Sequence, residues 1–464
     1  MRDLETDYLV VGAGASAMAF TDALVANADV DVVMVDRRHN PGGHWNDAYP
    51  FVRLHQPAAT YGVNSLPLGR ETIDTIGSNA GYYERATGTE IVAYYRQVLD
   101  DVLLPSGKVR FFGGCSYTGN WSDDHSFVSG LSGATTSVRV RRAVVDTTYM
   151  ETQVPATHTP SFVVGDGARF IPVGELVDVG DAPDGFTILG SGKTAMDACC
   201  WLLENGVDPD RIRWIRPRDA WLTERATFQP LDLIGGAVTR LGRAVEAMAQ
   251  AEDVDDLFRR LEDDGQVLRL DRSVWPSMYR GPLVSRLEHE ALQQIERVVR
   301  LGHVKVIGPD EIVLDGGEIP TTGREVHVDC TAYGFRAVGP RPIFEPGRIT
   351  PQTLMGGFVS FNTAVIGYVE AVRDDVAEKN RLCVPTRLPN EPVDWIGAYA
   401  GGLNANLVHS AEPDLAAWID GSRLNTFRGM TAHGADPDVA AGLTTMIENL
   451  GAALTNADRM LARA

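Results

Sequence analysis

The sequence predicts an α/β protein with two Rossmann-like dinucleotide-binding domains, the second inserted in the first, followed by a helical C-terminal extension. Three observations support this prediction. A GxGxxA motif follows an apolar strand near the start of the chain, and a second GxGxxA motif follows another strand at residues 190–195. Two similar β-rich stretches, 144–149 (VVDTTY) and 326–335 (VHVDCTAYGF), flank the second motif. A chain that leaves one domain and later returns to it explains this order.

The first motif has the residue types that a dinucleotide-binding turn requires. Tyr8–Val11 is typical of a buried strand, and Gly12, Gly14 and Ala17 follow it at the motif's spacing. The first glycine permits a sharp turn, the second lets the backbone approach a pyrophosphate, and the small third residue lets helix and strand pack closely. The next strand ends in Asp36, where a carboxylate can accept hydrogen bonds from ribose hydroxyls. A glycine-rich turn without a ligand is the alternative.

The second motif repeats this pattern between the predicted strands Phe186–Leu189 and Ile212–Ile215. We expect its motif residues to hold a second dinucleotide: Gly190, Gly192, Thr194 and Ala195. The letters GSGKT also suggest a P-loop. That motif needs a glycine at position 187, which is Thr187, so an ATPase is excluded on spacing.

The second ribose position carries the opposite charge to the first. In place of an acid, the strand Ile212–Ile215 is followed by Arg216 and Arg218. A guanidinium group at this point suits a 2′-phosphate, so the second motif is expected to bind NADP rather than NAD. Two exposed arginines at a strand end are the alternative.

Composition limits the classes of partner. The chain has 464 residues, 44% hydrophobic content and a formal net charge of −20, with a sequence pI of about 4.9. This charge disfavours nucleic acid and anionic membranes as general partners. The acidic start MRDLETD shows no signal peptide and no apolar run is long enough to span a bilayer, so a cytoplasmic protein is expected. The five cysteines show no metal-ligand spacing and no redox pair near the first motif, so we expect no metal and no disulfide reductase.

A long polar and aromatic segment follows the first motif. Gly42 and Gly43 permit close approach of the backbone to a ligand, and the stretch Asp47–Ser65 has little periodicity. A loop of this length inside a compact domain is usually functional. The side chains that could line a cofactor or substrate site are His44, Trp45, His55, Gln56, Tyr61 and Asn64. For any one of them, ordinary loop packing is the alternative.

We expect residues 1–155 and 325–385 to form the discontinuous first domain, residues 156–324 the second domain, and residues 386–464 the helical extension. An acidic, mostly helical insertion is expected at about 226–304. Four aromatic residues in or beside it either wall a pocket or, more commonly, pack in the core: Trp221, Phe228, Trp275 and Tyr279.

A helix is expected at Thr363–Val372, with Phe361, Asn362 and Thr363 at its start. A helix N-terminus offers backbone N–H groups and the positive end of a dipole, which would stabilise negative charge. Asn362 and Thr363 are therefore candidate cofactor-binding residues.

With these motifs in place, the sequence resembles the class B flavin monooxygenases over about residues 5–380. The resemblance rests on the two GxGxxA motifs, the Gly-Gly-x-Trp at 42–45 and the Asp-x-Thr-Ala-x-Gly at 329–334. It implies FAD at the first motif and NADPH at the second. It also implies a role in FAD binding for residues in and after the first motif: Gly12, Gly14, Ala17, Asp36, Arg37, Gly43, His44 and Trp45. The linker fingerprint F-x-G-x-x-x-H of the family is missing, since Phe162 and Gly165 have the wrong spacing, so the chain resembles a divergent branch.

The family implies an NADPH-dependent monooxygenase that forms a flavin C4a-hydroperoxide and oxygenates a small metabolite with O₂, with nitrogen as one candidate acceptor. His55 or Gln56 would position the substrate or the hydroperoxide as the catalytic candidates. Two alternatives stay open: an NADPH-dependent flavin oxidoreductase or dehydrogenase without oxygen insertion, and a flavin-binding interaction protein. The helical tail is a candidate element of a homo-oligomer.

Overall fold

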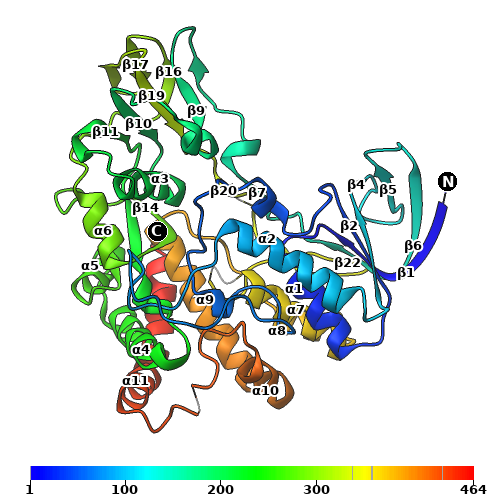
Figure 1. The fold of residues 1–464 in the computed structure, drawn as a ribbon. Helices are drawn as coiled ribbons and strands as arrows, with labels where there is room; N and C mark the ends of the chain where they lie inside the picture. Colours follow the sequence, from blue (N-terminus) through cyan, green and yellow to red (C-terminus); the bar gives the residue numbers. More distant parts are fainter. Residues whose placement is uncertain (1, 337, 357–358, 431, 464) are drawn as a thin grey trace.

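The computed structural model describes residues 2–336, 338–356, 359–430 and 432–463. Figure 1 shows two α/β units side by side, with a group of helices packed against the second unit. The first unit carries the N-terminus and helix α1 (Ala15–Asn27), and the second carries helix α3 (Lys193–Glu204). The second unit is inserted in the sequence of the first, and the two share one cavity.

The first sheet is built around β1 (Arg2–Val11), which pairs in parallel with β2 (Val32–Asp36) and β6 (Thr135–Asp146). β2 is buried along its whole length, as expected for a strand of a parallel sheet that is covered on both faces. The sheet order is β21-β22-β6-β1-β2-β3, with β4 and β5 added beside β6. The remaining strands are β3 (Val109–Gly113), β4 (Cys115–Tyr117), β5 (Ser126–Ser129), β21 (Phe344–Glu345) and β22 (Arg348–Ile349).

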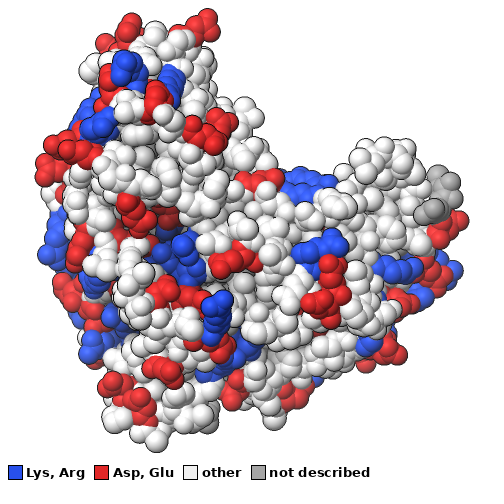
Figure 2. Space-filling view, viewed as in Figure 1, with Lys and Arg blue, Asp and Glu red and all other residues white. Residues whose placement is uncertain are grey.

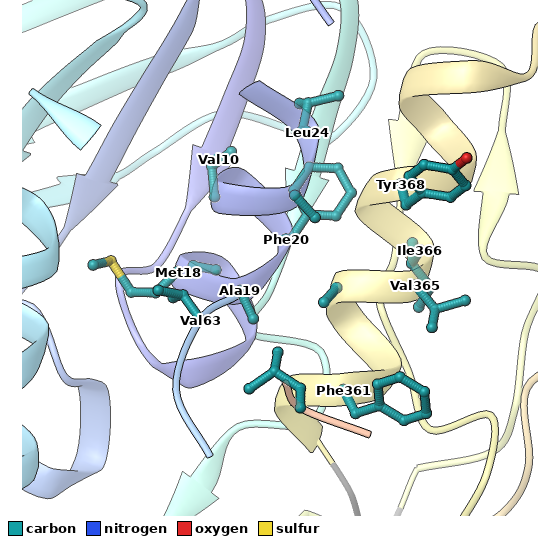
Figure 3. Close-up of a cluster of buried hydrophobic side chains, with 14 of the residues drawn as sticks. Val10, Met18, Ala19, Phe20, Leu24, Val63, Phe361, Val365, Ile366 and Tyr368 are labelled. Atoms are coloured by element: carbon teal, nitrogen blue, oxygen red, sulfur yellow. The ribbon is translucent and has the colours of Figure 1, made fainter. Parts of the chain in front are cut away.

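Helix α1 packs against helix α7 (Val359–Val372), although more than 300 residues separate them in the sequence. Figure 3 shows the two helices side by side in one hydrophobic cluster, which includes Phe20 and Leu24 of α1 and Val365 and Ile366 of α7. The two backbones are close at Gly367, where an added Cβ would lie 2.5 Å from the carbonyl oxygen of Phe20. Helix α2 (Gly88–Gln97), which begins with a capping box, covers the same core.

The second sheet contains only parallel strands in the order β15-β11-β10-β19-β9. Its strands are β9 (Phe170–Pro172), β10 (Gly185–Leu189), β11 (Ile212–Ile215), β15 (Val298–Val299) and β19 (Glu325–Asp329). The placement of β19 corrects one prediction. Residues 325–329 were expected to begin the return to the first domain, but they pair with β10 in the second sheet because their buried side chains complete its core.

The return occurs a few residues later. β7 (Thr152–Gln153), on the outgoing chain, pairs antiparallel with β20 (Gly334–Phe335), on the returning chain. The chain then adds β22 to the first sheet beside β6. The predicted fold class, with the second dinucleotide-binding domain inserted in the first, is confirmed.

The insertion is less helical than predicted. Besides α4 (Ile234–Gln250), α5 (Val254–Asp263) and α6 (Arg286–Gln293), a three-stranded sheet is present: β12 (Ala220–Glu224), β13 (Val267–Leu268) and β14 (Met278–Val284). A separate four-stranded sheet contains β8 (Val163–Val164), β16 (Val304–Ile307), β17 (Glu311–Leu314) and β18 (Gly317–Pro320).

The C-terminal extension is helical, as predicted. It follows α8 (Val376–Leu382) and consists of α9 (Pro392–Ser410), α10 (Pro413–Gly421) and α11 (Pro437–Leu461). Helix α11 crosses α4 closely, because Gly242 and Gly442 meet without side chains between the backbones. The extension therefore forms one core with the insertion, which includes residues of α4, α5, α9 and α11.

Acidic and basic side chains are interspersed over the face shown in Figure 2, in a chain whose net charge is −20. Within the described ranges, the model contains no helix with the length and apolarity that a membrane span requires.

The contact between α1 and α7 yields a paired prediction on stability. We expect Gly367→Ala to lower the free energy of unfolding by about 1–3 kcal/mol, because the added methyl group collides with the backbone of α1. Gly451→Ala is the matched control, since no atom lies within 4 Å of its added Cβ in helix α11. In Gly451→Ala the better helix propensity of alanine should raise the free energy of unfolding by up to about 1 kcal/mol. Urea unfolding measures both, and equal effects of the two variants would contradict the packing described here.

Candidate functional site

A cavity of about 1270 Å³ lies between the two units and reaches both glycine-rich turns. Gly12 and Gly14 line it on one side, and Gly192 and Thr194 line it on the other. Both turns follow the carboxyl ends of parallel strands, which is where open α/β sheets bind their ligands. The cavity therefore connects the two turns.

The first turn has the geometry of a pyrophosphate site. Gly12 has a φ of 108°, and its N–H donates to the carbonyl of Val35 at 2.8 Å. A side chain at Gly12 would collide with the hydroxyl of Thr147, so only glycine fits. Helix α1 starts after Gly14 with no side-chain cap and no acidic residue in its first turn. The backbone also passes close by at Gly43, where an added Cβ would lie 2.9 Å from the Cα of Gly14. The first N–H groups of α1 are thus left for an anion.

Asp36 stands at the end of β2, as predicted, and is almost fully buried. One carboxylate oxygen accepts from the N–H of Ala13 and the other from the N–H of Arg38, both at 2.7 Å. Burial raises the pKa of Asp36, while these two hydrogen bonds oppose that rise. A carboxylate can accept further hydrogen bonds, so it remains able to meet ribose hydroxyls. Arg37 lines the cavity and pairs with Glu151 at 2.6 Å.

The second turn repeats this geometry. Gly190 has a φ of 115°, and its N–H donates to the carbonyl of Ile215 at 3.0 Å. An added Cβ on Gly190 would lie 2.8 Å from the carbonyl oxygen of Cys330. Helix α3 begins after Gly192, again without a side-chain cap or an acid in the first turn. The indole of Trp214 donates to the carbonyl of Gly190 at 2.7 Å and holds the turn in place.

A hydrogen-bonded group joins the two units at the middle of the cavity. Lys193, the first residue of α3, forms an ion pair with Asp197 one helical turn later. The phenol of Tyr49, from the loop after the first motif, donates to the other oxygen of Asp197 at 2.7 Å. Burial and the neighbouring Asp197 raise the pKa of Tyr49 well above its usual value, so the phenol remains a hydrogen-bond donor at neutral pH.

The structure separates the two arginines that were predicted to bind the 2′-phosphate. Arg216 is only 3% exposed and does not line the cavity. Its guanidinium lies over the ring of Trp214 at 5.0 Å and pairs with Asp219 at 3.4 Å. The prediction for Arg216 is therefore wrong in this structure, because its side chain packs inward. Arg218 does line the cavity.

A second arginine joins Arg218 from another element. Arg280, on β14, donates through Nε and Nη2 to the amide oxygen of Asn390 at 2.9 and 2.8 Å. Arg218 approaches the same oxygen at 3.4 Å and the sulfur of Met278 at 3.5 Å. The guanidinium of Arg280 also lies 5.7 Å from the ring of Tyr333. Burial and the nearby Arg218 lower the pKa of Arg280. Neither arginine forms an ion pair with a carboxylate of the described residues, so the pair is suited to an anion.

The start of α7 differs from the prediction. The described part of this helix already begins at Val359, so Asn362 and Thr363 lie within it and are buried. The side-chain oxygen of Asn362 accepts from the N–H of Met355 at 3.1 Å, and its amide donates to the carbonyl of Gly356 at 3.3 Å. The hydroxyl of Thr363 donates back to Val359 at 3.0 Å. The expectation of direct cofactor contact is therefore wrong, and Asn362 instead holds a loop that lines the cavity.

His55 and Gln56, the catalytic candidates, both line the cavity and are half-buried. Burial lowers the pKa of His55 to about 3, and the positive charge of Lys193 contributes. Burial likewise lowers the pKa of His44 to about 4. The amide of Gln56 donates to the carbonyl and the hydroxyl of Thr60 at 3.1 and 3.2 Å. Both imidazoles are therefore neutral at pH 7, and the Gln56 amide group is held in one orientation.

Trp45 and Tyr61 face the cavity together, since the indole N–H of Trp45 donates to the phenol oxygen of Tyr61 at 2.8 Å. The ring of His44 lies 5.1 Å from that of Trp45. Asn64 does not line the cavity, and its side chain instead accepts from the hydroxyl of Ser422 in the C-terminal extension at 2.8 Å.

A buried carboxylate, Glu288, connects the two units behind the cavity. One of its oxygens accepts from Arg85 of the first unit at 3.0 Å, and the other from Arg225 at 2.5 Å. Burial alone would raise the pKa of Glu288, but Lys193, Arg225 and Arg85 lower it to about 2. Arg225 also donates to the side chain of Asn79 at 3.1 Å. This network fixes the loop of the first unit against α6.

Of the predicted site residues, thirteen reach the cavity: Gly12, Gly14, Asp36, Arg37, Gly43, His44, Trp45, His55, Gln56, Tyr61, Gly192, Thr194 and Arg218. Three small residues instead serve the turns and the helix packing: Ala17, Gly190 and Ala195. Sequence reasoning missed Tyr49 and Arg280, because their partners Asp197 and Asn390 are distant in the sequence. It also missed Lys193, whose partner Asp197 is one helical turn away and could have been found from the i,i+4 spacing. In the described part of the chain no group of three or more potential metal ligands occurs.

Comparisons with known proteins agree with this geometry. Residues 10–71 match the family model of the NAD(P)-binding Rossmann-like domain. Two solved structures share the fold. An oxidized steroid monooxygenase bound to NADP has a TM-score of 0.53 and 13% identity, covering 88% of this chain and 98% of that one. A polycyclic ketone monooxygenase from the fungus Thermothelomyces thermophila has a TM-score of 0.54 and 11% identity, covering 98% of this chain and 90% of that one. The chain thus shares the overall fold of these two monooxygenases.

Uncharacterized proteins of Mycobacterium tuberculosis and Mycobacterium bovis are 44% identical to this chain over 429 residues, covering 91% of this chain and 78% of each relative. The chain belongs to the same protein family as these mycobacterial relatives.

The buried imidazole of His55 yields a prediction on pH dependence. In the unfolded chain His55 takes up a proton near its usual pKa of 6.5, whereas in the folded chain it does so only near pH 3. The free energy of unfolding should therefore fall as the pH drops below 6.5, and His55→Gln should fall less steeply between pH 7 and pH 5. His39→Gln, at an exposed histidine in the same region, is the control and should follow the wild type. Urea unfolding at the two pH values measures this, and parallel curves for all three proteins would contradict it.

Proposed function

We propose that this protein is an NADPH-dependent FAD monooxygenase that oxygenates a small molecule with O₂. One observation carries the proposal: two dinucleotide-binding turns, with an acid after the first and unpaired arginines beside the second, open into one cavity. A single dinucleotide would need only one of these turns. The opposite charges at the two ribose positions favour FAD in the first and NADPH in the second.

The residues of the first turn fit FAD. The uncapped start of α1 would hold the pyrophosphate, and Asp36 the ribose. Trp45, His44 and Tyr61 line the adjoining part of the cavity, where a flavin ring would meet apolar and aromatic surface. Bound there, the flavin would accept a hydride from NADPH and react with O₂.

The residues of the second turn fit NADPH. The start of α3 would hold its pyrophosphate, and Arg218 with Arg280 would hold the 2′-phosphate as two charge-assisted donors. Lys193 stands at the first position of α3, where it adds positive charge beside the phosphates.

The chain's own residues would exclude water and orient the reactants, since the cofactors supply the oxidative chemistry. His55, neutral at pH 7, would accept or donate a hydrogen bond without adding charge. The amide N–H groups of Gln56 and the phenol O–H of Tyr49 already have partners, so Gln56 offers its side-chain oxygen as an acceptor. Nitrogen is one candidate for the substrate atom that receives the oxygen.

The decisive experiment follows the flavin spectrum. The purified protein should retain FAD, and anaerobic NADPH should bleach its visible absorption. Admission of ¹⁸O₂ with an oxidisable substrate should place the label in the product. Bleaching without label would indicate an oxidoreductase that does not insert oxygen. A protein that binds FAD but never bleaches would favour an interaction protein, and failure to bind FAD would overturn the proposal.

The arginine pair yields a prediction on coenzyme choice. Arg218→Ala and Arg280→Ala should each raise the Kd for NADPH by about tenfold to a hundredfold, because each removes a charge-assisted contact, while NADH binding changes little. Arg272→Ala is the control, since its exposed side chain lies outside the cavity. Arg216→Ala should weaken both coenzymes alike through lost packing on Trp214. Anaerobic titration of flavin reduction measures these values, and selective loss of NADPH in Arg216→Ala alone would restore the assignment that the structure corrects.

A further inference from the structure

One wall of the cavity is built by the C-terminal extension, which lies outside the family resemblance. Along helix α9, residues spaced three or four apart line the cavity, namely Trp395, Tyr399, Leu403 and Asn406. This spacing places one face of α9 on the cavity along about three turns. At Gly402 an added Cβ would lie 3.5 Å from the Cα of Met355, so the wall reaches the loop before α7.

The opposite side of this region comes from the insertion. Tyr279 of β14 lies 6.3 Å from Trp395, edge to face, and Trp395 stacks on Tyr399 at 4.5 Å. We call Tyr279, Trp395 and Tyr399 the aromatic wall. The phenol of Tyr279 lies 3.0 Å from the hydroxyl of Thr223. Apolar side chains complete the surroundings in this part of the cavity: Leu241, Leu261, Val267, Met278, Leu283 and Phe427.

The charges around the cavity are unevenly distributed. Among the described residues that line it, the carboxylates are Asp36 and Glu151, and both lie beside the first turn, where Glu151 pairs with Arg37. Beside the aromatic wall the charged lining residues are arginines, such as Arg218 and Arg280. An ammonium group placed here would lose its hydration, and no described carboxylate that lines this part of the cavity offers it a counter-charge.

We infer that the space beside the aromatic wall is the substrate chamber, and that it accepts a neutral, mainly apolar, ring-bearing molecule rather than a protonated amine. This inference rests on the proposed function for the identity of the reaction, but the binding preference is independent of it. Rings stack on aromatic side chains and bury apolar area, while Gln266, Thr223 and Asn406 offer polar contacts for a carbonyl or hydroxyl.

A set of probes with one carbon skeleton tests the inference on the full-length protein loaded with FAD. The probes are 2-tetralone, which is neutral, 2-aminotetralin, which is an ammonium ion at pH 7, and tetralin-2-carboxylate. Equilibrium dialysis measures the Kd of each. We expect 2-tetralone to bind at least about tenfold more tightly than 2-aminotetralin, because the ammonium ion would lose its hydration without a counter-charge. Tetralin-2-carboxylate tests the preference for a neutral molecule, since Arg218 and Arg280 attract anions, and tighter binding of the carboxylate than of the ketone would overturn the inference. Binding of 2-aminotetralin as tight as that of the ketone would overturn the inference.

Two variants locate the binding. Tyr399→Ala removes part of the aromatic wall, and Asn406→Trp fills the chamber from an exposed position of α9 that the core does not need. Each should weaken 2-tetralone by about tenfold. Trp275→Ala is the matched control, since this aromatic side chain contacts Trp221 at 5.0 Å but is 38% exposed and lies outside the cavity. Unchanged binding in both Tyr399→Ala and Asn406→Trp would overturn the assignment.

The same preparations separate this inference from the proposed function. Anaerobic bleaching of the flavin by NADPH is measured in the wild-type protein and should be unchanged in Trp275→Ala, whose side chain lies outside the cavity. Selective binding of 2-tetralone without any bleaching would support the chamber and refute the proposed reaction. Bleaching without selective binding would do the reverse.

Discussion

The position of one buried carboxylate fixes the relation between the two units. Glu288 is 4% exposed and accepts hydrogen bonds from Arg85 of the first unit and Arg225 of the insertion. It also completes the capping box of α6 with Ser285, whose hydroxyl donates to the carbonyl of Ser78 in the first unit. A buried charge that lost one of these partners would cost several kcal/mol, so the network tolerates few alternative positions of the units. The cavity depends on this restraint, because its two sides belong to different units.

The same restraint brings together side chains from the two units. Tyr49 reaches Asp197 across the boundary, and that contact holds Lys193 at the start of α3. His55 lies on the same wall, and its backbone carbonyl accepts from Arg225 at 3.4 Å. The ion network therefore positions the candidate catalytic loop as well as the units. Neutral side chains at this point suit a site in which the cofactors carry the electrons and the protein controls water and orientation.

The sequence predicts what local physics decides. The turns at Gly12 and Gly190 were predictable because their φ values strongly favour glycine. The strands that precede them, β1 and β10, were also predictable. The inserted topology was predicted from two similar β-rich stretches, although the second of them begins as β19 of the second sheet and the return starts only at β20. The sequence could not predict which way a side chain points or which residues distant in the sequence it contacts. A strand-end arginine can face a ligand or fold back, and Arg216 folds back because Trp214 offers a ring to cover it. Arg280 joins the site only because β14 pairs with β12.

The distribution of carboxylates links the cofactors to the substrate. In the proposed function Asp36 meets the ribose of the first dinucleotide, and Arg218 with Arg280 meet the 2′-phosphate of the second. The described carboxylates that line the cavity, Asp36 and Glu151, both lie beside the first turn, so the space along α9 offers aromatic rings but no counter-charge for a cation. The uneven distribution of carboxylates that would separate the two dinucleotides would therefore also disfavour cationic substrates. A relative that accepted amines would need a carboxylate in the chamber, and Gln266 or Asn406 are the lining positions where a one-step amide-to-acid exchange would supply it.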